Sequence, residues 1–150
     1  MSGVPVDDGR CFACGPENAI GLRMQFERSG DGVVAHLRLR PEFQGWKGIA
    51  HGGIAIALLD EVMAHAAGAA GHRGVTASLD ARFRKPVPLD EPLVVFGRVT
   101  GERRNVLSLE GRVSDAAGNI LLEGTARFLS RGPLEAVDDR RNPNADLAGR

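Results

Sequence analysis

The sequence predicts an α+β fold in which one buried helix packs on one face of an antiparallel sheet. Residues 52–67 form a long run of helix-forming apolar residues. A helix that is apolar on nearly every side is typical of one that the rest of the protein encloses. Four strand-like runs follow it, and the turns between them are short. Short turns join antiparallel neighbours, whereas parallel strands need long crossovers, so the pattern predicts an antiparallel sheet.

Length and charge exclude several classes of protein. The 150 residues suit one domain with its own core. With 19 basic and 19 acidic residues the formal net charge is +0, so no broad field attracts nucleic acid or an anionic membrane. A membrane span at 52–67 is disfavoured because Asp60 and Glu61 lie at its centre, where each costs about 2.5–3.5 kcal/mol. Because residues 1–10 also lack the apolar segment of a signal peptide, we expect a cytoplasmic protein.

The chain before the helix predicts turns and one hairpin. Residues 11–22 are rich in glycine, proline and asparagine and predict a turn-rich segment. Residues 23–27 and 33–40 alternate apolar with polar side chains, which predicts two paired strands. Residues 41–50 are expected to form a loop that leads into the helix.

The helix is expected to end near Gly68 and Gly71, because glycine commonly stops a helix. We divide the chain into a flexible N-terminus at 1–10, a folded domain at 11–131 and a disordered tail at 132–150, which is polar and rich in glycine and proline. The strands predicted after the helix are 75–84, 93–100, 105–114 and 120–130.

The two cysteines, Cys11 and Cys14, form a C-x-x-C pair. Their number excludes a framework of several disulfides, and a tetrahedral zinc site needs four ligands, of which this pair supplies two. A redox pair would start a helix after a strand, and that context is not evident here. A homodimer would complete a four-cysteine site, but a structural or incidental pair is the favoured reading, and we predict no metal site.

Two further runs resemble a known family. Residues 44–53 (QGWKGIAHGG), followed by 58–61 (LLDE), resemble the hotdog-fold acyl-CoA thioesterases of the PaaI-like group. The specific part is His-Gly-Gly with an aspartate nine positions after the histidine. The resemblance extends over roughly residues 11–130, and its other parts are 75–79 (VTASL), 84–87 (RKPV), 11–15 (CFACG) and Gly21-Leu22.

The resemblance implies a hotdog fold, a long helix wrapped by a five- or six-stranded antiparallel sheet, assembled as a homodimer or a dimer of dimers. It also implies hydrolysis of an acyl-CoA thioester without a cofactor, since coenzyme A is part of the substrate. Other hotdog relatives are hydratases or dehydratases, or bind acyl-CoA without turnover. Those hydratases pair a catalytic histidine with the helix acid, and the spacing of His65 does not fit that pattern.

Gly52 and Gly53 are candidates for an oxyanion hole. A helix start presents unpaired N–H groups and a partial positive charge, and glycine lets a substrate approach the backbone. The alternative is a glycine pair that only eases a tight turn. For His51 we favour a structural role, orienting the loop or capping the helix, over a catalytic one.

Asp60 is the expected base or nucleophile, because the family places its carboxylate nine residues after the histidine of His-Gly-Gly. Glu61 is the rival, but adjacent helical residues point about 100° apart, so the two cannot both face one substrate. We expect Glu61 to pair with His65, four positions on. Family members often carry a hydroxyl in the strand after the helix, so the resemblance implies that Thr76 or Ser78 holds the attacking water. Both stay open, because alternate residues of a strand share a face.

The spacing on the helix predicts a shared site. Gly53 and Asp60 are seven residues apart, or about 10 Å of helix rise. A base must come within about 3 Å of the attacking water, so one helix can hardly serve both ends of the reaction. Two chains related by a two-fold axis would bring Gly53 of one to Asp60 of the other.

The remaining candidates concern the substrate. The family often has an asparagine or glutamine a few residues before His-Gly-Gly as a second donor to the thioester carbonyl, and the resemblance implies that role for Gln44, whose position is shifted by about one residue. Trp46 is a candidate for the acyl pocket. Basic residues near two strand ends would bind coenzyme A phosphates through charge-assisted hydrogen bonds, although an ordinary solvated surface explains each of them as well. These residues are Arg82, Arg84, Lys85, Arg103, Arg104 and Asn105.

Overall fold

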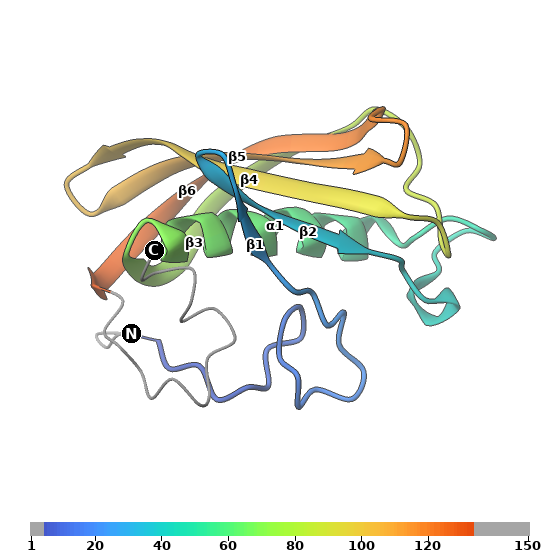
Figure 1. Ribbon diagram of the computed structural model, residues 1–150, viewed down its shortest axis with the longest axis horizontal. Helices are drawn as coiled ribbons and strands as arrows, with labels where there is room; N and C mark the ends of the chain where they lie inside the picture. Colours follow the sequence, from blue (N-terminus) through green and yellow to red (C-terminus); the bar gives the residue numbers. More distant parts are fainter. Residues whose placement is uncertain (1–4, 134–150) are drawn as a thin grey trace.

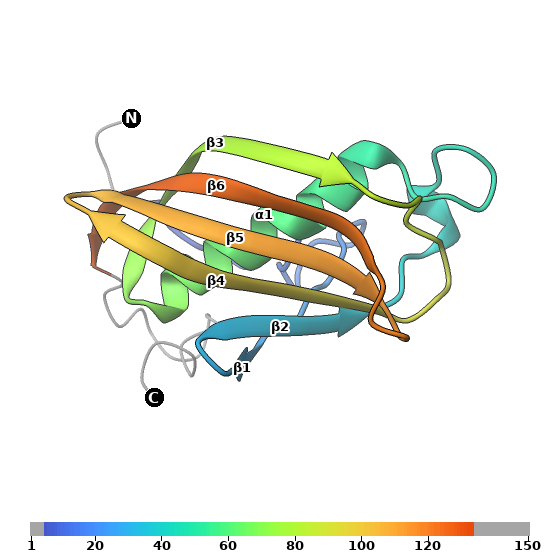
Figure 2. The same ribbon diagram turned by 90° about the horizontal axis from the view of Figure 1, so that it is seen from above.

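In the computed structural model, which describes residues 5–133, one long helix lies along one face of a six-stranded antiparallel sheet (Figures 1 and 2). The sheet order is β1-β2-β4-β5-β6-β3. This architecture confirms the predicted hotdog arrangement. The elements are β1 (Glu27–Ser29), β2 (Gly32–Leu37), the short 3-10 helix η1 (Pro41–Phe43), α1 (Gly52–Ala69), β3 (His72–Phe83), β4 (Leu93–Arg103), β5 (Val106–Asp115) and β6 (Ile120–Pro133).

The first hairpin is shorter than the sequence predicted. Only residues 27–29 pair with β2, and residues 23–26 stay outside the sheet. The Met24 N–H donates instead to the Ala13 carbonyl at 2.9 Å, and Arg23 adopts a left-handed conformation with φ 55°. Met24 is buried, as the apolar alternation indicated, but its backbone is hydrogen-bonded to the turn-rich segment and not to a neighbouring strand.

Other boundaries shift by a few residues. Gly68 lies inside α1, and the chain turns at Gly71, whose φ of +93° favours glycine. β3 therefore starts at His72 rather than at residue 75. β6 runs through residues 132 and 133, at the start of the predicted tail, and the rest of that tail lies outside the described residues, as do residues 1–4.

α1 sits on a row of glycines that crosses three neighbouring strands. Gly97 of β4 pairs with Gly111 of β5, which pairs with Gly124 of β6. A Cβ added at Gly97 would lie 2.9 Å from the Val62 carbonyl oxygen, and one at Gly124 would lie 2.9 Å from a Leu59 methyl carbon. The missing side chains therefore let the helix lie close to the sheet. Around this contact the helix and strands bury Leu58, Leu59, Val62, Met63, Val95, Leu107, Leu109, Val113 and Leu122.

The face of α1 away from the sheet is only partly covered. Residues 11–26, here called the N-terminal segment, pack over its C-terminal half, where the Phe26 ring stacks on His65 with 3.8 Å between centroids. Ile54, Ala57 and Asp60 remain half-buried. Within residues 5–133, α1 alone is long and apolar enough to cross a membrane, a test that the core helix of a soluble protein also passes.

The glycine row makes a stability prediction. We expect Gly97→Ala to lower the free energy of unfolding by about 1–3 kcal/mol, because the new methyl group must displace the backbone of α1 or of β4. Gly101→Ala in the same strand is the matched control, since a Cβ there meets nothing within 4 Å, and its effect should stay within about 0.5 kcal/mol. Urea unfolding measures both. Equal effects at the two positions would contradict the close-packing role.

Candidate active site

His51 is the N-cap of α1. Its Nδ1 accepts a hydrogen bond from the Gly53 N–H at 3.0 Å, and its carbonyl oxygen accepts from the N–H groups of Ile54 and Ala55 at 2.9 and 3.0 Å. A side-chain acceptor at the N-cap satisfies a donor that the helix itself leaves unpaired. The capping role favoured for His51 is therefore confirmed.

This cap distinguishes the two glycines predicted to form the oxyanion hole. The Gly53 N–H is occupied by the His51 ring, whereas the Gly52 N–H makes no hydrogen bond to another residue in 5–133. Gly52 is exposed, and its nearest neighbour is the Phe83 ring, 3.7 Å from where a Cβ would stand. Gly52 is thus the donor open to an incoming oxygen.

Phe83 was not among the predicted site residues. It is 47% exposed at the end of β3, beside the start of α1 (Figure 2). The signal in the sequence was a large apolar side chain set between Arg82 and Arg84, but its position beside Gly52 depends on tertiary structure.

Asp60 meets Thr76 between the helix and the edge strand β3. The Thr76 hydroxyl donates to Asp60 Oδ1 at 2.7 Å. Burial raises the pKa of Asp60 above its ordinary value, and the nearby Glu61 charge adds to this rise, while the Thr76 hydrogen bond opposes it. The result is a half-buried carboxylate that is a stronger base than an exposed aspartate.

A β-bulge separates Thr76 from Ser78. Thr76 pairs with Phe128 and Ser78 with Arg127, so Ala77 is an extra residue in β3. Thr76 faces the helix, as its bond to Asp60 shows, whereas beyond the bulge Leu79 and Ala81 pack on the core. Ser78 therefore points to the other face of the sheet, and the expectation that 76 and 78 share a face is wrong.

Glu61 points to a different side of α1 from Asp60. Its Oε1 lies 3.0 Å from His65 Nε2, which confirms the expected pair, and 3.5 Å from Cys11 Sγ. Burial opposes ionisation of Glu61, but hydrogen bonds from His65, Cys14 and Cys11 and the charge of His65 outweigh it and hold the pKa of Glu61 below its ordinary value. Of the two rival carboxylates, Asp60 is the one near an open surface with few partners.

Gln44 and Trp46 lie in the loop before α1. Gln44 Oε1 accepts a hydrogen bond from the Gly48 N–H at 3.0 Å, so this side chain braces the loop. Its suggested role as a donor to the substrate stays a prediction. Trp46 is 84% exposed, and its suggested role in the acyl pocket stays a prediction.

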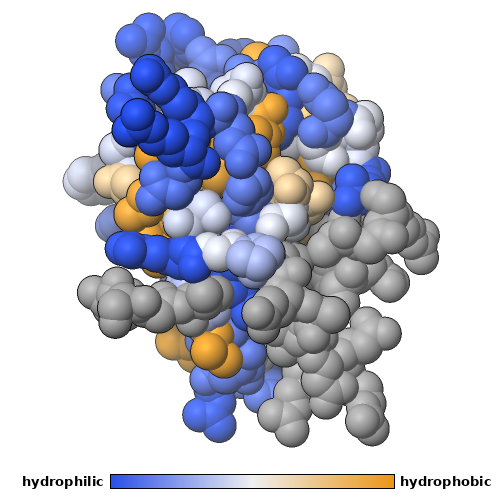
Figure 3. All heavy atoms as spheres, turned by 90° about the vertical axis from the view of Figure 1, so that its left-hand side faces the viewer, coloured by the Kyte–Doolittle hydropathy of each residue, from blue (hydrophilic) through white to orange (hydrophobic). Residues whose placement is uncertain are grey.

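The two basic clusters lie at opposite ends of the sheet. Arg82, Arg84 and Lys85 stand where β3 ends, and Arg84 Nε donates to Glu123 Oε1 at 2.9 Å. Arg103 ends β4, and Arg104 and Asn105 form the β4–β5 turn, at the end where β3 begins (Figure 2). Figure 3 views that end, where most of the described surface is hydrophilic. One chain therefore cannot bring both clusters to one substrate.

One cavity lies away from Asp60. It has a volume of about 520 Å³ and is bounded by residues 5–14, the C-terminal half of α1 and the start of β3. Glu61 and His65 line it, and Asp60 does not. The carboxylate predicted to be catalytic therefore lies outside this cavity, half-buried between α1 and β3.

Comparisons with known proteins support one family. No curated protein sequence matches the chain. Among solved structures, protein RHA08564, described as a thioesterase superfamily protein, is 30% identical with a TM-score of 0.77 over 81% of this chain. The match spans only 60% of that protein's length.

Two streptococcal structures share the fold at lower identity. The smu.793 protein of Streptococcus mutans UA159, solved bound to acetyl CoA, has a TM-score of 0.68 and 19% identity over 73% of this chain and 90% of that one. A hypothetical thioesterase protein of Streptococcus pneumoniae TIGR4, solved with coenzyme A, has a TM-score of 0.69 and 22% identity over the same shares. The thioesterase superfamily model matches residues 47–121, half of the sequence, and the chain belongs to that superfamily.

Proposed function

We propose that this protein hydrolyses an acyl-CoA thioester to a free acid and coenzyme A, with Asp60 as general base or nucleophile. The observation that carries the proposal is the bond from Thr76 to Asp60, which fixes a carboxylate of raised pKa at an open surface between α1 and β3. Membership of the thioesterase superfamily supports the reaction type, and the streptococcal relatives solved with acetyl CoA and coenzyme A support the carrier.

The two carboxylate oxygens of Asp60 have different roles in the proposed reaction. Thr76 binds Oδ1, so Oδ2 is left to accept a proton from water or to attack the carbonyl carbon. As a base it takes a proton from the water that attacks the thioester. The carbon–sulfur bond then breaks, and the coenzyme A thiolate leaves and takes up a proton.

Gly52 would stabilise the oxygen that gains charge. Its N–H lies at the positive end of the α1 dipole and has no acceptor among the described residues. Loss of one such donor typically raises the barrier by about 2.7–4 kcal/mol. The helix start also stands beside Phe83, which would contact the acyl chain or the carrier.

Gly52 and Asp60 of one chain are too far apart to share a substrate. They are separated by eight residues, about 12 Å of helix rise. β3 is an edge strand of 12 residues, and such long edges are usually covered. We infer that two chains associate through this side of the molecule, so that Asp60 of one chain faces Gly52 of the other and each dimer holds two sites. Association of two such dimers into a tetramer would leave both sites of each dimer intact.

A further support comes from the Streptococcus pneumoniae protein. Its structure has also been determined with an aspartate replaced by alanine and with a threonine replaced by alanine. Those two residues are 16 positions apart in that chain, the separation between Asp60 and Thr76 here.

The first test is turnover. We expect Asp60→Asn to lower kcat at least about 100-fold, because the amide cannot take up a proton. Asp80→Asn, on the outer face of the same sheet, is the control and should match the wild type. Free thiol release from a panel of acyl-CoAs measures the rate. Equal rates for Asp60→Asn and the wild type would refute the assignment, and binding without turnover in the wild type would indicate a non-catalytic acyl-CoA-binding module.

The pH profile tests the role of Thr76. Because the Thr76 hydrogen bond lowers the pKa of Asp60, Thr76→Val should raise that pKa. A base acts only when deprotonated, so the acidic limb of the kcat/KM profile should move to higher pH, and kcat should fall about tenfold or more. Ser78→Ala, on the other face, should leave both unchanged. A limb that stays in place in Thr76→Val would count against the pair.

Mixing two inactive variants tests the shared site. Gly52→Val and Asp60→Asn each damage both sites of their own homodimer. If the sites are shared, a heterodimer carries one intact site, so random mixing should restore about a quarter of the wild-type activity. No recovery, after subunit exchange is verified by mass spectrometry, would exclude sharing.

A further inference from the structure

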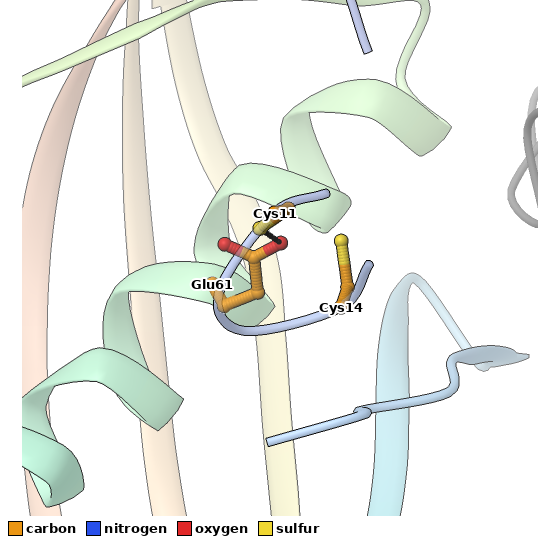
Figure 4. A group of neighbouring side chains, drawn as sticks. All are labelled: Cys11, Cys14 and Glu61. Atoms are coloured by element: carbon orange, nitrogen blue, oxygen red, sulfur yellow. Dashed lines mark hydrogen bonds between the residues drawn. The ribbon is translucent and has the colours of Figure 1, made fainter. Parts of the chain in front are cut away.

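Three potential metal ligands converge on the side of α1 that the proposed chemistry does not use. Figure 4 shows Glu61 reaching from α1 toward Cys11 and Cys14 of the N-terminal segment. Their two sulfur atoms and a carboxylate oxygen all lie within 4.8 Å of one another, and Cys11 Sγ is 3.5 Å from Glu61 Oε1. The sequence placed only two of these ligands together, because Glu61 follows Cys11 by 50 residues.

The backbone holds the C-x-x-C turn in this shape. The Gly15 N–H donates to the Cys11 carbonyl oxygen at 2.8 Å, and a Cβ on Gly15 would lie 2.4 Å from the Cys11 nitrogen. The Leu22 N–H donates to the Phe12 carbonyl and the Met24 N–H to the Ala13 carbonyl, at 2.8 and 2.9 Å. The two thiols are thus presented to a rigid helix by a turn that only glycine permits.

We propose that Cys11, Cys14 and Glu61 bind a zinc ion, with His65 as the fourth ligand. In a tetrahedral zinc site with Zn–S near 2.3 Å and Zn–O or Zn–N near 2.0–2.2 Å, neighbouring ligand atoms lie about 3.3–3.8 Å apart. The observed separations of 3.5 Å from Cys11 to Glu61 and 3.0 Å from Glu61 to His65 are close to these values. The pairs formed by Cys14 with Cys11 and with Glu61 lie within 4.8 Å and require a side-chain adjustment of about 1 Å, whereas His65 stands outside this group of three and must move further to reach the two sulfur atoms.

The donor atoms fit zinc better than other common cations. Thiolates select zinc over calcium or magnesium, which prefer oxygen ligands, and C-x-x-C is the usual spacing of a zinc-binding pair. Cysteine binds zinc as the thiolate, so zinc binding would displace the thiol protons.

Zinc at this position would join the N-terminal segment to the core. Residues 5–26 contain no helix or strand, and residues 5–14 form one wall of the 520 Å³ cavity next to Glu61 and His65. The ion would cross-link the N-terminal segment to α1 beside the stacked rings of Phe26 and His65. This role is structural and independent of thioester hydrolysis.

Metal content and cobalt substitution test the site directly. We expect one zinc ion per chain in reduced protein purified without a histidine tag. Replacement by cobalt should give the absorption bands of a tetrahedral ion and thiolate-to-cobalt charge transfer. Substoichiometric zinc together with no charge-transfer band in the wild type would overturn the proposal, and would leave the thiols as a hydrogen-bonded pair or a disulfide.

Variants identify the ligands. Loss of an outer-shell partner typically costs 10–100-fold in metal affinity, so Cys11→Ser, Cys14→Ser and Glu61→Gln are each expected to weaken zinc binding by more than about 100-fold. Asp60→Asn, the adjacent carboxylate, is the matched control and should bind zinc as the wild type does while losing hydrolysis. Unchanged affinity in either cysteine variant would overturn the site, and unchanged affinity in His65→Gln would overturn His65 as a ligand.

A measurement on the wild type alone covers variants that fail to fold. The rate at which a thiol reagent modifies Cys11 and Cys14 should fall at least tenfold when zinc is added and recover when a chelator is added. An unchanged rate would overturn the proposal. Neither this assay nor the metal titration involves substrate, so their failure is distinguishable from failure of the hydrolase assignment.

Discussion

The close contact between α1 and the glycine row of the sheet is the constraint on which the rest of the structure depends. Gly97, Gly111 and Gly124 stand side by side on three strands, and a Cβ at these positions would lie 2.9, 3.1 and 2.9 Å from atoms of α1, closer than ordinary van der Waals contact. Rotation and position of the helix are thereby fixed. The two adjacent carboxylates of α1, Asp60 and Glu61, consequently have different neighbours.

Those surroundings explain why the pKa of Asp60 is raised and the pKa of Glu61 is lowered. Burial disfavours the charged form of both side chains. Asp60 receives one hydrogen bond, from Thr76, which does not offset burial, so its pKa rises. Glu61 receives bonds from His65 and from two cysteines, which do offset it, so its pKa falls. The first is suited to accept a proton during a reaction, and the second to act as a permanent anion that holds cations or donors.

Much of the fold was predictable because it rests on periodicity and turn residues. The apolar run at 52–67, the four later strands and the pairing of Glu61 with His65 follow from local spacing and agree with the structure. What was not predictable depends on contacts between distant segments. The bulge at Ala77, which turns Ser78 away from the helix, reflects pairing with β6 and leaves no mark in the alternation of residues.

In the candidate site, too, local motifs were predictable from the sequence and contacts between distant segments were not. The motif identified His51, Gly52, Gly53 and Asp60, but the choice between the glycines required the hydrogen bond from the Gly53 N–H to the His51 ring. Likewise, C-x-x-C favoured a structural or incidental cysteine pair in sequence, and a third potential metal ligand became visible only when folding placed Cys11 beside Glu61.

The central claim is that α1 contributes two half-sites, Gly52 at its start and Asp60 near its middle, to two different substrates. A crystal structure of the dimer with a non-hydrolysable thioether analogue of an acyl-CoA tests it most directly. We expect the carbonyl-equivalent oxygen within about 3 Å of the Gly52 N–H of one chain and the Asp60 carboxylate of the other chain within about 3.5 Å of the reacting carbon. An analogue bound away from both residues, or held by Gly52 and Asp60 of the same chain, would contradict it.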